Sequence, residues 1–143
     1  GGIVGIQALA GSISTIGIFG HRILQGGNIL SQFERYGIQA ATQLKKAVQG
    51  TGLQAHHIIE QRFASTLGQT VSQAREWLSI AVTPKEHQIF TNAWRNAIGY
   101  INSNNPLNTA TATKDDLWRI AQEIYGKYPA ILEAAKQIIF NSK

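Results

Sequence analysis

The feature that most constrains the fold is a strong helix start at Thr83. Thr83 can accept a hydrogen bond from the amide of Glu86 while the Glu86 side chain reaches back, the reciprocal pattern of a capping box. Pro84 takes the first helical position, where its missing N–H is harmless. Apolar residues then recur at three- and four-residue steps on the face that contains Trp94. The sequence therefore predicts a helix over residues 84–100 that packs one face into a core.

Apolar spacing and turn residues divide the rest of the chain into further helices and two extended segments. From residue 28 to residue 48 an apolar residue recurs every three or four positions, which predicts one amphipathic helix. Two glycines within residues 49–52 end this helix and mark a boundary between an N-terminal helical part (1–52) and a second part (53–143). We also expect helices at 71–78, 114–125 and 129–140, a loop at 102–113, and extended segments at 53–59 and 79–83. These elements predict an α+β fold that is predominantly α-helical.

The composition excludes several classes of protein. With 143 residues, 43% hydrophobic residues and a net charge of +5, the chain is one folded, mildly basic domain and not a disordered or highly charged tail. Cysteine is absent, which excludes disulfides, thiolate zinc sites and cysteine nucleophiles, so any metal must use His, carboxylate or carbonyl ligands. Methionine is absent even at position 1, and we interpret the chain as a piece of a longer polypeptide or a processed product.

The first twenty residues are uncharged and rich in glycine and aliphatic side chains. Ile6, Leu9, Ile13 and Ile16 recur at helical spacing, so we expect a hydrophobic helix within residues 1–20 that packs on the domain. A membrane-entry segment is the alternative. The glycines weaken a spanning helix and no basic region precedes the stretch, so membrane contact is not favoured.

Three of the four histidines stand where they can do chemistry. His56 and His57 are adjacent, and in an extended segment their side chains point to opposite sides, so that one can bind a metal while the other faces the substrate. His87 lies in the first turn of the helix that begins at Pro84. Taken alone, His87 is also compatible with an ordinary core or capping histidine.

The order of these elements resembles that of a ββα-metal nuclease finger. The segment around Ala55-His56-His57 resembles the signature of the HNH/endonuclease VII superfamily, in the branch named for its Ala-His-His motif and found as C-terminal domains of bacterial polymorphic toxins. The segment 82–88 supplies the helix histidine, His87. The resemblance implies a small ββα-metal core at 53–100, flanked by N- and C-terminal helices.

The resemblance also implies roles for the three histidines. His56 is a catalytic metal ligand, His57 is the general base that activates water, and His87 is the second ligand of a divalent ion such as Mg²⁺, Mn²⁺ or Zn²⁺. Ser79 stands where the family has the asparagine that orients the base, so a serine hydroxyl or a backbone carbonyl must replace it. Thr91 stands where colicin-type relatives have a third histidine, which implies a two-histidine site.

Basic residues near these histidines are candidates for binding nucleic acid. Arg62 follows the histidine pair, and Lys85 and Arg95 lie on the predicted metal helix, so all three can approach a phosphate backbone. Simple solvation is the alternative for each of them. Glu60 is a possible carboxylate ligand or a surface salt-bridge residue, and the tryptophans Trp77, Trp94 and Trp118 fit apolar helix faces of a core.

By resemblance, the chain is a metal-dependent endonuclease that is secreted or delivered from the cell surface as part of a larger polypeptide. It acts on nucleic acid in the cytoplasm of a target cell, with DNA favoured over RNA. A cognate immunity protein neutralises it in the producing cell, and the resemblance implies no small-molecule cofactor. Two alternatives stay open. One is a toxin ribonuclease that uses histidine acid/base chemistry on tRNA or other RNA without a metal. The other is a non-catalytic helical module whose N-terminal helix docks a partner or a membrane.

Overall fold

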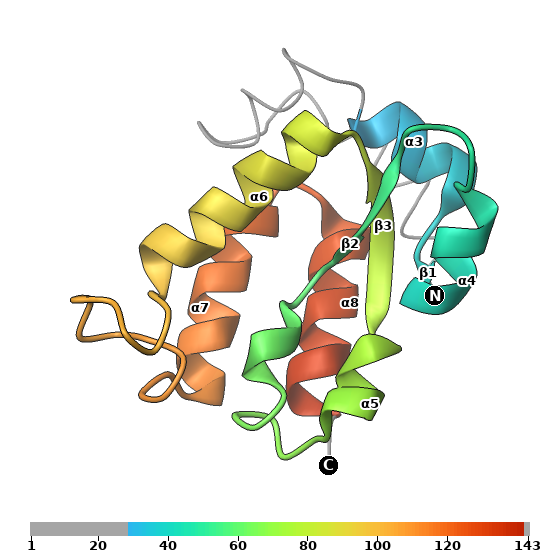
Figure 1. Cartoon of the computed structure of the whole chain (residues 1–143). Helices are drawn as coiled ribbons and strands as arrows, with labels where there is room; N and C mark the ends of the chain where they lie inside the picture. Colours follow the sequence, from blue (N-terminus) through green and yellow to red (C-terminus); the bar gives the residue numbers. More distant parts are fainter. Residues whose placement is uncertain (1–28, 142–143) are drawn as a thin grey trace.

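The computed structural model describes residues 29–141 (Figure 1). The helix expected within residues 1–20, and its alternative as a membrane-entry segment, lie outside this range. Within the described range, no helix is both long and apolar enough to span a membrane.

The described chain is an α+β structure in which helices dominate, as the sequence predicts. The elements in chain order are α3 (Ile29–Tyr36), β1 (Gln39–Ala40), α4 (Ala41–Ala47), β2 (Gln54–His57), a 3-10 turn (Gln61–Phe63), α5 (Val71–Arg75), β3 (Leu78–Val82), α6 (Pro84–Ala97), α7 (Lys114–Tyr125) and α8 (Pro129–Phe140). The two expected extended segments form β2 and β3. The capping box predicted at Thr83 is present, and a second one at Thr113 opens α7. The helices α7 and α8 have the bounds expected for them, 114–125 and 129–140.

A small antiparallel sheet has the strand order β1-β3-β2. The central strand β3 pairs with β1 through Gln39 and Ser79, and with β2 through the partners His56 and Ile80. Among residues 29–141, β2 is therefore an edge strand of this sheet, with no strand paired to its outer side. Both histidines of the Ala-His-His segment lie on this edge.

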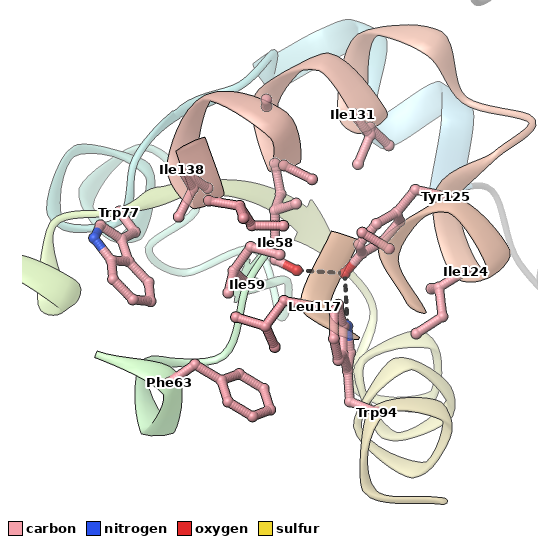
Figure 2. Close-up of a cluster of buried hydrophobic side chains, with 14 of the residues drawn as sticks. Ile58, Ile59, Phe63, Trp77, Trp94, Leu117, Ile124, Tyr125, Ile131 and Ile138 are labelled. Carbon is pink, nitrogen blue, oxygen red and sulfur yellow. Dashed lines mark hydrogen bonds between the residues drawn. The ribbon is translucent and has the colours of Figure 1, made fainter. Parts of the chain in front are cut away.

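Alternate residues of β3 face two different layers of the molecule. Ile80 and Val82 belong to the large core shared with α6, α7 and α8, whereas Ala81 packs against Leu44 and Val48 of the α4 region. Figure 1 shows α4 and α7 on opposite sides of the sheet, and Figure 2 shows part of the large core under α8. The edge strand β2 is thus reached by helices from both faces of the sheet.

The prediction of one continuous helix over residues 28–48 is wrong. Gly37 has a φ of +68°, a left-handed conformation that glycine adopts without the steric cost of a Cβ, and it ends α3. The chain then makes the two residues of β1 before α4 begins. Phe33 of α3 is fully buried in the same core as Ile58 and Trp94. Apolar spacing alone missed this break, because the two short helices keep their apolar residues at helix-like intervals.

Helix α6 ends at Ala97, three residues before the predicted end at Tyr100. The guanidinium group of Arg62 accounts for the early end, because it donates hydrogen bonds to the carbonyls of Trp94, Ile98 and Gly99 (3.4, 2.6 and 3.0 Å). The carbonyls of Trp94 and Gly99 also accept from the backbone N–H groups of Ile98 and Thr109, so among the described residues it is the carbonyl of Ile98 that depends on Arg62. Ile98 is accordingly extended, with φ −131° and ψ 104°.

Candidate functional site

A polar pocket of about 380 Å³ lies at the outer side of the edge strand. Its walls come from α4, β2, the turn after β2, and the first turn of α6. The residues that line it are Lys45, Ala55, His56, His57, Glu60, Gln61 and His87. The three histidines that the sequence singled out thus meet in one place.

His56 occupies the side of β2 that faces the large core. It is only 2% exposed, and its ring stacks on Phe90 with the ring centroids 4.7 Å apart. Its Nε2 atom lies 2.8 Å from the hydroxyl oxygen of Tyr125. The ring of His87 contacts it edge-on, with the centroids 5.3 Å apart.

The hydrogen bonds of Tyr125 determine which nitrogen of His56 carries the proton. The Tyr125 hydroxyl donates its proton to the carbonyl of Ile58 (2.7 Å) and accepts from Trp94 Nε1–H (3.1 Å) (Figure 2). Because its one proton is used, its oxygen can only accept from His56 as well, through Nε2–H. His56 Nε2 is therefore the donor, and Nδ1 keeps its lone pair. A protonated nitrogen held by a fixed acceptor, with the second nitrogen free, is the usual state of a metal-binding histidine.

His57 points to the other side of β2, as the sequence predicts for neighbours in a strand. Its Nε2 atom lies 3.2 Å from the carbonyl oxygen of Arg75, which only accepts, so Nε2 carries the proton and Nδ1 the lone pair. The side-chain amide of Gln61 lies 3.5 Å from that Nδ1. Ser79 does not orient His57, because its buried hydroxyl donates to the carbonyl of Trp77. The group that accepts from the His57 ring is the backbone carbonyl of Arg75 and not the hydroxyl of Ser79.

His87 reaches the pocket because the capping box places it in the first turn of α6. Its Nδ1 atom lies 2.7 Å from the side-chain oxygen of Gln54, so Nδ1 donates and Nε2 keeps the lone pair. Gln54 and His56 are two residues apart in β2 and therefore share a face. The same strand face thus supplies His56 and the group that orients His87.

Burial favours the neutral form of all three imidazoles. Burial lowers the pKa of His56 well below 6.5, and the nearby His87 and His57 rings lower it further. Burial also lowers the pKa of His87 and is the largest cause of the lowered pKa of His57, to which the charge of Lys45 adds. Neutral imidazoles are the form needed for binding a metal or for accepting a proton.

His56 and His87 each keep one lone pair and are the two imidazoles that could hold a divalent ion. Among the described residues, no group of three or more His, Cys, Asp and Glu side chains is arranged to hold a metal. Of the Mg²⁺, Mn²⁺ and Zn²⁺ expected, imidazole nitrogens suit Zn²⁺ best. Thr91, one turn beyond His87, is part-buried in α6. Glu60 lines the pocket but accepts a 2.7 Å ion pair from Arg62, and it is part-buried and not on the surface.

The three basic residues expected to contact phosphate, Arg62, Lys85 and Arg95, lie in different surroundings. Arg62 uses all five N–H donors on Glu60, Thr109 and the three carbonyls at the end of α6, and its guanidinium also lies over the rings of Phe63 and Tyr100. Arg62 is therefore a structural residue, and the expectation that it contacts phosphate does not fit. Lys85 and Arg95 are exposed on α6 but do not line the pocket.

Two residues of this site were missed by reasoning from the sequence. Tyr125 lies 69 positions after His56, and it shows only the helical spacing of an ordinary core residue. Lys45 and Lys46 form a pair that is too short to be read as a basic tract in the sequence. Only the packing of α4 on the sheet brings Lys45 to the histidines.

A comparison of the chain with protein-family models, curated proteins and solved structures finds no match. The residues of the pocket are therefore the basis for inferring its function.

Proposed function

We propose that the chain is a metal-dependent endonuclease of the HNH type that hydrolyses phosphodiester bonds of DNA. The observation that carries this proposal is that three histidines line one pocket and each keeps a lone pair on one ring nitrogen: Nδ1 of His56, Nδ1 of His57 and Nε2 of His87. The order β2, β3, α6, with two histidines on the first strand and one on the helix, also supports it, because it resembles the order of a ββα-metal core.

His57 is the general base in this proposal. Its Nδ1 lone pair removes a proton from the attacking water, a task for which an imidazole near neutral pH is well suited. The Nε2–H bond to the carbonyl of Arg75 holds the ring in orientation and stabilises the imidazolium that forms. His57 thus receives the proton at one nitrogen while the backbone holds the other.

His56 and His87 are the residues that would hold the metal. When bound, a divalent ion neutralises charge on the phosphate and on the leaving 3′ oxygen. The protein contributes the two lone pairs and keeps them available, because Tyr125 and Gln54 hold the opposite N–H groups.

The metal-free ribonuclease is the weaker alternative. Acid/base cleavage through the ribose 2′-OH needs one neutral histidine and one protonated histidine near neutral pH. The lowered pKa values of His56, His57 and His87 all favour the neutral form, whereas this reaction also needs a protonated histidine. The preference of all three histidines for the neutral form supports the metal-dependent reaction.

The biological setting follows from the resemblance alone. We propose a toxin domain that is delivered to a neighbouring cell as part of a longer polypeptide, acts in its cytoplasm, and is neutralised in the producer by an immunity protein. Expression of the chain inside bacteria should be toxic, and the His57→Ala variant should be harmless. A wild-type chain without toxicity would contradict the toxin role.

The nuclease activity is tested with supercoiled plasmid and with total tRNA, each in Zn²⁺, Mn²⁺ or Mg²⁺ and in EDTA. We expect plasmid nicking that EDTA abolishes and added metal restores. His57→Ala and His87→Ala should both lose it, while Gln88→Ala, an exposed neighbour on α6, should keep it. Cleavage of tRNA that survives EDTA supports the ribonuclease instead. Silence on both substrates supports a binding module, which liposome or partner binding that depends on residues 1–27 would then identify.

A further inference from the structure

Lys45 extends an uncommitted positive charge into the histidine pocket. The residue is exposed on α4, it lines the pocket, and it makes no ion pair with a described residue. It is also the only permanent cation among the described residues that form the pocket wall. Glu60 on the same wall is already paired with Arg62.

The packing of α4 fixes this position. Leu44 and Val48 are 0% and 4% exposed and form a small cluster with Ala81 of β3, against which Ala55 of β2 packs. This cluster anchors α4 on the face of the sheet that carries Ala55. Lys45 follows Leu44 directly, so its side chain leaves the helix beside the anchored face.

Lys45 and His57 approach the pocket from the same side of the strand. Ala55 and His57 are two positions apart in β2 and therefore share a face, which is the face that α4 covers. His56 is directed to the opposite side, toward Phe90 and Tyr125. The base is thus accompanied by a lysine, and the two free metal-binding nitrogens come from the other side.

We propose that Lys45 binds a phosphate of the nucleic-acid backbone at the bond that His57 attacks. The inference rests on the proposed nuclease function and extends it to the substrate contact. A compact ammonium group is a suitable partner for a phosphate oxygen, and the three other cations considered are either engaged, as Arg62 is, or outside the pocket wall, as Lys85 and Arg95 are. It follows that α4 belongs to the active site, although it precedes the glycines of residues 49–52.

The test uses the full chain with His57→Ala, so that binding is measured without cleavage. Its affinity for a short DNA duplex is followed by fluorescence anisotropy from low to high salt, with and without Lys45→Ala. The matched control is Lys46→Ala, the exposed neighbour that does not line the pocket. A second variant, Lys45→Arg, keeps the charge, and thermal unfolding confirms that each variant is folded.

We expect Lys45→Ala to reduce the slope of log affinity against log salt by about 1, which is roughly an eightfold loss of affinity at 0.1 M salt. Lys45→Arg should restore most of the slope, and Lys46→Ala should leave it close to that of the parent. Equal effects of Lys45→Ala and Lys46→Ala would overturn the proposal, as would a parent that binds no nucleic acid. A chain that binds DNA through Lys45 but never cleaves it would contradict only the nuclease function.

Discussion

Two buried tyrosines offer a matched test of the hydrogen-bond network behind His56. Tyr125 and Tyr128 are both 0% exposed, but the Tyr125 hydroxyl makes three hydrogen bonds, whereas the Tyr128 hydroxyl has no partner among the described residues. Tyr125→Phe removes the partner of Ile58 O, of Trp94 Nε1–H and of His56 Nε2–H. Each buried group left without a partner costs about 1–3 kcal/mol.

We expect Tyr125→Phe to lower the free energy of unfolding by about 3 kcal/mol, the lower end of that sum, because neighbouring groups relax into the space left by the oxygen. For a chain of this size the melting temperature then falls by roughly 10 °C. Tyr128→Phe removes a buried hydroxyl that gains nothing from burial, so the free energy of unfolding should stay equal or rise by about 1 kcal/mol. Urea unfolding followed by tryptophan fluorescence and circular dichroism measures both.

The same pair also tests the orientation of His56. Without the acceptor at Nε2, the His56 proton is free to move to Nδ1, so Tyr125→Phe should weaken Zn²⁺ binding by about tenfold in calorimetric titration, and Tyr128→Phe should not. Equal destabilisation by the two variants, or a loss below about 1 kcal/mol for Tyr125→Phe, would refute the reasoning about the network. Unchanged Zn²⁺ affinity in a folded Tyr125→Phe chain would refute the role of Tyr125 in holding His56.

Three further predictions concern the scaffold. Arg62→Met should lower the free energy of unfolding by about 3 kcal/mol, because it leaves the buried carbonyl of Ile98 and the Glu60 carboxylate without their partner. Chemical unfolding measures this, and a loss below about 1 kcal/mol would contradict the structural role of Arg62. Hydrogen bonds from Thr113 lower the pKa of Asp116, so the ionised Asp116 carboxylate stabilises the fold above its ordinary pKa, and this stabilisation is lost as the pH falls. The difference in melting temperature between wild type and Asp116→Ala should therefore be clear at pH 7 and absent near pH 2. A difference that does not change with pH would contradict this prediction. Gly37→Ala should lower the free energy of unfolding by about 1 kcal/mol. The cause is the positive φ at this position and not a steric clash, since no atom lies within 4 Å of the added Cβ. Gly37→Asn should lower it less, and equal melting temperatures for wild type and both variants would contradict the argument.

Local signals in the sequence predicted much of the fold. The capping boxes at Thr83 and Thr113 each depend on residues three positions apart, so they are visible without any knowledge of the rest of the structure. The same holds for the placement of His87 in the first turn of α6. The histidine pair and the short extended segment were equally local, and the structure brings all of them to one pocket.

What could not be predicted depends on contacts between distant parts of the chain. Arg62 looked like a free cation beside the histidines, but folding brings it to the end of α6, where it donates to the carbonyl of Ile98, 36 residues further along the chain. Tyr125 acts on His56 over a separation of 69 residues. The break at Gly37 was hidden because glycine is compatible with either a continued helix or a left-handed turn, and the pairing of β1 with β3 decides between them.

The most direct test of the account is the initial rate of plasmid nicking by the wild-type chain and by His57→Ala at the same Zn²⁺ occupancy, established beforehand by titration. Because His57 is assigned the proton transfer and not the metal, the variant should bind Zn²⁺ like the wild type while its rate falls by at least about a hundredfold. Equal nicking by the two chains, or a wild-type chain that binds Zn²⁺ and DNA but leaves the plasmid intact, would contradict the proposed nuclease.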